Sequence, residues 1–219
     1  MPSTDPEPGT THTPPNHHAD HPGFSGAAAL VATLTIAAKP RGPERLAGEL
    51  TGIGPGDRLV DIGCGPGAGC RLAARRGATA VGVDPSAQML RLAGWATTLR
   101  PGVGRSTVEY RPGGAEHLPV DDGWATVAWS MASVHHWPEL ERGLAEAHRV
   151  LTPGGRFLAM ERCTEPGASG LASHGWTGQQ AELFASMLAG TGFDAVTHTV
   201  HQARPYRVHV VQGRRPGST

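Results

Sequence analysis

The chain has 219 residues, a length that favours one folded domain. Its 19 Lys and Arg residues balance 19 Asp and Glu residues, so it lacks the overall positive field by which proteins hold nucleic acids or anionic membranes. We therefore expect neither a nucleic-acid partner nor a membrane partner.

The first 24 residues contain six prolines and four histidines but no Val, Ile or Leu. They cannot bury enough apolar area to offset the entropy lost on ordering, so residues 1–24 are predicted to be a disordered tail. Histidines set among prolines without thiol partners are poor metal ligands, and we predict no metal site. A single domain is expected over residues 25–212, with a flexible C-terminus at 213–219.

The sequence shows no pattern typical of a membrane span or a secretion signal. The longest apolar run, residues 27–38, is shorter than the about 20 residues that cross a bilayer. The first seven residues lack a basic start and an apolar core. Cys64, Cys70 and Cys163 form neither an even disulfide framework nor a C-x-x-C pair. We expect a cytoplasmic protein with reduced thiols.

From residue 56 onward, short β-branched runs alternate with segments rich in Ala, Leu and Arg. This alternation is typical of repeated βα units and a parallel sheet, with a helix between successive strands. The predicted strands are 58–62, 79–83, 106–111, 124–131, 155–160, 195–202 and 206–212. The predicted helices are 43–50, 71–76, 138–151 and 177–189. Only three residues separate the last two strands, so that pair must form an antiparallel hairpin.

A glycine-rich stretch joins the first of these strands to the next helix. Glycine lets the backbone approach a ligand closely, and the N-terminus of the following helix offers free N–H groups. Gly63, Gly65 and Ala68 also match the dinucleotide fingerprint, which is weak by itself. Asp84 ends the second strand, where a carboxylate can bind both hydroxyls of an adenosine ribose. A nucleotide-like cofactor is implied.

Asp61, two residues before the first glycine, indicates which kind of nucleotide-like cofactor the loop binds. Its negative charge beside the loop suits a cofactor with an ammonium and a sulfonium better than one with a pyrophosphate. S-adenosylmethionine carries both of those cationic groups.

At this point the sequence resembles the class I S-adenosylmethionine-dependent methyltransferases, in particular the broad small-molecule group with ubiquinone/menaquinone-type members. The resemblance covers residues 56 to about 161 and rests on five ordered blocks, at 60–67, 81–86, 115–120, 130–137 and 149–157. It implies an α/β fold, a Rossmann-like three-layer sandwich around a seven-stranded mixed sheet with an antiparallel C-terminal hairpin. It also implies methyl transfer from S-adenosylmethionine to a small-molecule acceptor; the acceptor atom and a homodimer are left open.

The resemblance implies roles for single residues. Gly63 and Gly65 would let the methionine part lie against the backbone, and Asp84 would accept hydrogen bonds from the ribose hydroxyls. Met89 would pack near the adenine, and Ser130 would face the methionine end. The implied cofactor-binding residues are Asp61, Gly63, Cys64, Gly65, Asp84, Pro85, Met89, Ala115, Glu116 and Ser130.

One position departs from the family pattern. Relatives often have an acidic residue just before the pair Ala115 and Glu116, where this chain has Gly114. The contact to the adenine amino group then falls to Glu116, falls to the backbone, or is lost.

His135 and His136 are the candidate catalytic residues. They follow the fourth strand, at the edge where open α/β sheets bind ligands, and an imidazole can take a proton from a hydroxyl or an amine. Transfer from an activated sulfonium depends mainly on placing donor and acceptor, so no base is obligatory. Glu161 and His174, after the fifth strand, are weaker candidates on the substrate side.

Segments 24–55 and 162–176 are predicted to enclose the acceptor, with Trp137 and Trp176 as a candidate aromatic wall. Two alternative functions stay open. An NAD(P)-dependent oxidoreductase would need no acid at position 61 but a Tyr-x-x-x-Lys or similar motif, and Lys39 is the sole lysine. A non-catalytic S-adenosylmethionine-binding protein is kept open by the departure at Gly114.

Overall fold

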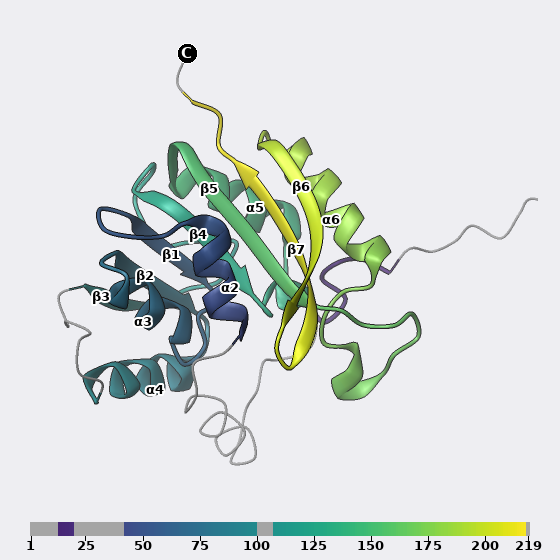
Figure 1. The fold of residues 1–219 in the computed structure, drawn as a ribbon, viewed down its shortest axis with the longest axis horizontal. Coiled ribbons are helices and arrows are strands. Elements are labelled where there is room, and N and C mark those ends of the chain that lie inside the picture. The colour runs from purple at the N-terminus through teal and green to yellow at the C-terminus, as the bar shows by residue number, and fades with distance from the viewer. Residues whose placement is uncertain (1–12, 20–41, 100–106, 218–219) are drawn as a thin grey trace, which may run out of the picture.

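A seven-stranded mixed sheet organises the protein in the computed structural model, which describes residues 13–19, 42–99 and 107–217. The strand order is β3-β2-β1-β4-β5-β7-β6 (Figure 1). The strands are β1 (Arg58–Ile62), β2 (Thr79–Asp84), β3 (Val108–Pro112), β4 (Ala125–Met131), β5 (Leu151–Arg162), β6 (Asp194–Ala203) and β7 (Tyr206–Arg214). Strands β1 to β5 are parallel, and β7 pairs antiparallel with both β5 and β6. The predicted mixed sheet and C-terminal hairpin are confirmed.

Helices cover both faces of the sheet (Figure 1). They are α2 (Gly42–Thr51), α3 (Ala68–Arg75), α4 (Ala87–Thr98), α5 (Leu140–Val150) and α6 (Gly178–Gly190), with short 3-10 turns η1 (Val134–His136) and η2 (Gly170–Ser173). Side chains of α2, α3 and α4 join one apolar cluster, and those of α5 and α6 join another. The result is the predicted three-layer sandwich.

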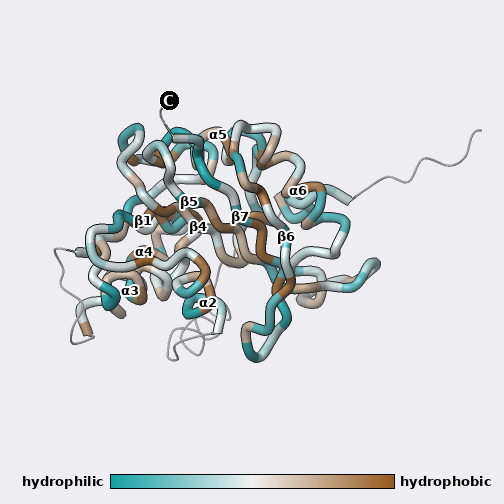
Figure 2. Tube along the Cα trace, turned by 45° about the horizontal axis from the view of Figure 1, so that its top comes forward, coloured by the Kyte–Doolittle hydropathy of each residue, from teal (hydrophilic) through white to brown (hydrophobic). Residues whose placement is uncertain are grey.

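The strands are apolar because both of their faces are covered. Along β4, Val127 and Trp129 join the cluster under α2 and α3, whereas Ala128 joins the cluster under α5. This alternation follows the two-residue period of a strand. Figure 2 shows the hydrophobic residues concentrated along the central strands.

The connection between β3 and β4 differs from a repeated βα unit, because residues 113–124 contain no helix. Buried Ala115, Leu118 and Val120 instead pack directly on the sheet face that carries α5. Strand β5 also begins at Leu151, earlier than predicted, because Leu151 is buried and pairs with Ala125.

Residues 13–19 lie within the tail predicted to be disordered, yet they form a turn that docks on the domain. The indole N–H of Trp176 donates to the Pro15 carbonyl (2.9 Å), and the Gln180 amide donates to the Pro14 carbonyl (3.0 Å). Composition did not predict this docking because the residues that bury Pro15 and donate to the turn lie more than 100 positions away in the sequence. The rest of the predicted tail and residues 24–41 of the predicted acceptor cover lie outside the described residues. No helix in the described part of the chain is long and apolar enough to cross a membrane.

Candidate functional site

The loop after β1 presents bare backbone at the carboxyl edge of the sheet. The N–H groups of Gly63 and Cys64 donate to the Val83 carbonyl (2.8 and 3.0 Å), which ties the ends of β1 and β2 together. Gly63 has φ +73°, and a Cβ there would lie 1.8 Å from Ser133 Oγ, so only glycine fits. A Cβ at Gly65 would meet no described atom within 4 Å. The backbone at Gly65 therefore faces space in which a ligand can approach it.

Asp84 links this loop to the start of α4. Its Oδ2 accepts from the Gly65 N–H (2.8 Å), and its Oδ1 accepts from the Ser86 N–H (2.9 Å). The cap of α4 is Ser86, whose hydroxyl accepts from the Met89 N–H, so Asp84 is not the helix cap. A carboxylate has about four lone-pair sites, and the two that remain can accept from a ligand's hydroxyls. Burial raises the pKa of Asp84, while the two N–H groups oppose the shift.

Asp61 lies beneath the loop rather than beside it. Its side chain is buried, and the Cys70 thiol donates to its Oδ2 (3.4 Å). A Cβ at Gly69 would lie 2.5 Å from the same oxygen, so the carboxylate packs against the first turn of α3. Burial raises the pKa of Asp61 to about 7. The negative charge expected here is therefore only partly developed at neutral pH before a cation binds.

The predicted adenine side is formed by the loop after β3. Ala115 is buried, and the Glu116 side chain folds back over Gly114, where an added Cβ would lie 2.4 and 2.6 Å from its two carboxylate oxygens. Glu116 Oε2 is buried and has no hydrogen-bond partner among the described residues. Of the two other predicted contacts, Met89 is half-buried and Pro85 is exposed. The Glu116 carboxylate thus fills the space that a side chain at position 114 would occupy.

Side chains of helix α5 bind the loop after β3. They fix a connection between β3 and β4 that contains no helix of its own. The Glu146 carboxylate accepts from the Leu118 N–H (2.7 Å). The Arg149 guanidinium donates to the Leu118 carbonyl (2.9 Å) and to the Val120 carbonyl (2.8 Å), and it also pairs with Glu146 (2.7 Å). The position of Glu116 therefore depends on two side chains that sequence reasoning did not single out.

Ser130, near the end of β4, was predicted to face the methionine part. Its side chain is fully buried, and its Oγ has no hydrogen-bond partner in the described part of the chain. Two unpartnered polar atoms, Ser130 Oγ and Glu116 Oε2, therefore accompany the open backbone at Gly65 and the spare lone pairs of Asp84. This set fits a ligand that combines a nucleoside with an amino acid.

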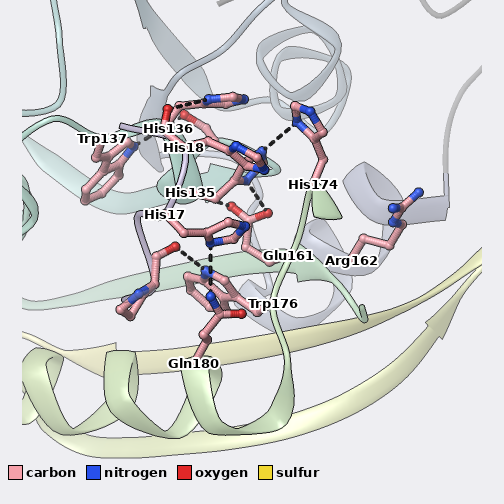
Figure 3. A network of polar contacts seen from close by, with 12 residues as sticks. His17, His18, His135, His136, Trp137, Glu161, Arg162, His174, Trp176 and Gln180 are labelled. Atoms are coloured by element: carbon pink, nitrogen blue, oxygen red, sulfur yellow. Dashed lines mark hydrogen bonds and ion pairs between the residues drawn. The ribbon is translucent and has the colours of Figure 1, made fainter. Parts of the chain in front are cut away.

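A histidine cluster lies beyond Ser133, at the ends of β4 and β5 (Figure 3). His135 in η1 is 2% exposed, and its Nδ1 lies 2.8 Å from Oε2 of Glu161, which is 1% exposed. His135 Nε2 lies 3.3 Å from His174 Nδ1. The structure therefore brings together the predicted catalytic His135 and the two weaker candidates.

His136 and two tail histidines complete the cluster. His136 Nδ1 lies 3.4 Å from the His18 carbonyl oxygen, and burial followed by the charge of His135 lowers the pKa of His136 to about 4. The His18 ring stacks on His174 with centroids 4.5 Å apart, and His17 Nδ1 lies 3.0 Å from the Gln180 amide nitrogen. No local pattern predicts these positions of His17 and His18, because their partners lie more than 100 residues away.

The two tryptophans of the predicted aromatic wall belong to the core instead. Trp176 is fully buried and packs on Phe184, with ring centroids 4.7 Å apart, and buried Trp137 packs against Gly143. A cavity of about 790 Å³ opens beside the cluster. Residues lining the cavity include Thr13, His17, Thr164, Ser173 and Gln180.

In comparisons with known proteins, the chain is similar to methyltransferases in both sequence and structure. A protein-family model described as "Methyltransferase domain" matches residues 60–159. The 27-O-demethylrifamycin SV methyltransferase of Amycolatopsis mediterranei is 34% identical over 129 residues, covering 58% of this chain and 46% of that protein. A ubiquinone/menaquinone biosynthesis C-methyltransferase of Rubrivivax gelatinosus is 34% identical over 109 residues, covering 50% and 41%. The chain thus spans less than half the length of these relatives.

Solved structures share the fold at low identity. An S-adenosylmethionine-dependent methyltransferase from Aquifex aeolicus matches with a TM-score of 0.68 and 15% identity, covering 87% of this chain and 100% of that one. The [4+2]-cyclase SpnF matches with a TM-score of 0.68 and 21% identity, covering 80% of each chain.

Proposed function

We propose that the chain, whose residues 60–159 match the family model "Methyltransferase domain", is a class I S-adenosylmethionine-dependent methyltransferase that transfers a methyl group to a small-molecule acceptor. Bound S-adenosylmethionine supplies the activated sulfonium methyl group, and S-adenosylhomocysteine is left. The observation that carries the proposal is the Asp84 carboxylate, which is fixed by the Gly65 and Ser86 N–H groups and keeps lone pairs free beside open backbone.

The residues along the strand ends divide the work of holding the cofactor. Asp84 accepts from the ribose hydroxyls, and the backbone at Gly63 and Gly65 lies against the methionine part. Glu116 accepts from the adenine amino group, a role supported by its buried and unpartnered Oε2. Ser130 Oγ lies at the end of β4, where it binds the methionine part.

We assign binding of the methyl acceptor to the region around His135 and His136. Ser133, two residues before His135, lies against Gly63 and so connects this region to the cofactor loop. Holding an acceptor in line with the sulfonium accounts for most of the rate of a methyl transfer, so these residues are assigned to positioning first. The acceptor atom, the cytoplasmic location, the lack of nucleic-acid and membrane partners and the oligomeric state remain predictions.

A labelled-methyl screen tests the proposal. The purified chain would be incubated with S-adenosylmethionine labelled on its methyl group and with panels of phenols, amines and carboxylates. Transfer to one class, lost in Asp84→Ala, is expected. If S-adenosylhomocysteine binds but no acceptor in any panel is labelled, the non-catalytic binding protein becomes the better description.

A further inference from the structure

Three histidines from two separate segments converge beside the acceptor side. His135 and His136 belong to η1 after β4, and His174 follows η2. One ring nitrogen of each lies within 4.8 Å of the others. We propose that these three imidazoles bind one divalent transition-metal ion, with Zn²⁺ as the best fit, through Nε2 of His135, Nε2 of His136 and Nδ1 of His174.

One nitrogen–nitrogen distance in the histidine cluster matches the distance between two ligands of the same zinc ion. His135 Nε2 and His174 Nδ1 are 3.3 Å apart. Zinc–nitrogen bonds of about 2.0–2.1 Å at tetrahedral angles put two ligand atoms about 3.3–3.4 Å apart. A direct N–H···N contact would usually be shorter, since hydrogen bonds donated by N–H cluster near about 2.9–3.0 Å.

The other ring nitrogen of two of these histidines is already held by an acceptor. His135 Nδ1 donates to buried Glu161, and His136 Nδ1 donates to the His18 carbonyl (Figure 3). Both contacts fix the tautomer in which Nε2 carries a lone pair. Metal-ligating histidines almost always have such an outer partner, most typically a carboxylate or a backbone carbonyl.

The donor set selects the class of ion. Imidazole ligands suit Zn²⁺, Cu²⁺, Ni²⁺ and Fe²⁺, whereas Mg²⁺ and Ca²⁺ require oxygen ligands. Three protein ligands leave the fourth position of a tetrahedral ion free, as in catalytic zinc sites. We assign that position to an oxygen or sulfur atom of the methyl acceptor. This last assignment rests on the proposed function, whereas binding of the ion does not.

The sequence predicted no metal site, because neither the cysteines nor the tail histidines show the spacing or partners of metal ligands. The third ligand lies 39 residues from His135, and the chain between them passes through α5 and β5. Only the fold brings His174 to η1, so the spacing of the histidines in the sequence carries no recognisable motif.

Zinc titration of the tag-free chain by calorimetry tests the site. One ion per chain is expected, and His174→Ala should weaken its affinity by more than 100-fold. Glu161→Gln should weaken it by about 10- to 100-fold, as outer-partner changes do. A matched control, His148→Gln in the last turn of α5, should keep the wild-type affinity.

A Co²⁺ titration followed by visible absorption reports the geometry, and intense bands typical of a tetrahedral site are expected in the wild type but not in His174→Ala. His174 is half-buried, so this variant should fold even if a change at buried His135 does not. The site is wrong if the wild type binds no Zn²⁺, or if His174→Ala binds it as tightly as the wild type. Binding of S-adenosylhomocysteine, measured separately, tells failure of the metal site apart from failure of the proposed function.

Discussion

The Glu116 carboxylate lies over the Cα of Gly114, at the place that a side chain on residue 114 would need. The chain therefore replaces the acidic residue expected at 114 by an acidic residue from two positions later. Buried Glu116 Oε2 is left without a partner among the described residues, and an unpaired buried acceptor is costly. An amino group of a bound ligand would satisfy it.

Changing Gly114 tests this replacement. An alanine Cβ would sit 2.4 Å from Glu116 Oε1, so Gly114→Ala should push the flexible carboxylate away with little loss of stability. The affinity for S-adenosylhomocysteine should fall by about 10-fold, which is the effect of losing a hydrogen bond of about 1.5 kcal/mol. Glu116→Gln should cause a similar loss, measured by calorimetry.

The double variant provides the control. If both changes remove one contact, the losses in binding free energy should not add. Additive losses, or a Gly114→Ala variant with wild-type affinity, would show that Glu116 does not bind the cofactor.

Asp84→Asn should raise the dissociation constant of S-adenosylhomocysteine by about 10- to 100-fold, because hydrogen bonds to a charged group contribute about 1.5–3 kcal/mol. Glu141→Gln, which removes an exposed carboxylate from α5, is the matched control and should change nothing. The measurement is calorimetry, with the unfolding midpoint recorded for each variant. Equal affinity of Asp84→Asn and the wild type would place the cofactor elsewhere.

Asp61 should make stability depend on pH. Its pKa rises from 3.8 to about 7 on folding, chiefly through burial, so the folded state binds more protons between these values. The stabilisation is complete below about pH 3.8 and is lost as the pH rises through about 7, by up to ~1.4 kcal/mol per pH unit.

Urea unfolding of the wild type and of Asp61→Asn from pH 4 to pH 8 measures this effect. The difference in unfolding free energy between Asp61→Asn and the wild type should move in favour of the variant as the pH rises, because the variant has no charge to bury. A difference that is constant across this range would contradict the raised pKa.

Arg149→Met should loosen the connection between β3 and β4, because the carbonyls of Leu118 and Val120 lose the hydrogen bonds donated by the guanidinium. We expect a loss of about 1–3 kcal/mol in unfolding free energy and weaker cofactor binding. Arg142→Met, which breaks an exposed ion pair on the same helix, should leave both unchanged. Faster amide hydrogen exchange in 113–124 should accompany the change at Arg149 alone.

The sequence predicted elements whose signals are local. The helix predicted at 177–189 is confirmed as α6, and it begins with a capping box in which Thr177 and Gln180 make both of the expected hydrogen bonds. The three residues between the last strands required a hairpin, and the glycines after β1 required a backbone loop. The positions of Gly63, Gly65 and Asp84 follow from these local rules and from the register of β1 with β2.

The sequence could not predict contacts that depend on distant donors. Pro15 docks because the buried Trp176 indole needs an acceptor, and these residues are separated by 161 positions. The helix-free connection at 113–124 is held by Arg149, which belongs to a different element. The contact of His135 with His174 likewise arises only when η1 and the segment after η2 reach the same edge of the sheet.

Calorimetric titration of the purified chain with S-adenosylhomocysteine and, separately, with NADH measures which cofactor the site binds. We expect one S-adenosylhomocysteine per chain, with binding lost in Asp84→Ala, and no response to NADH. Tight binding of NADH without any response to S-adenosylhomocysteine would contradict this expectation.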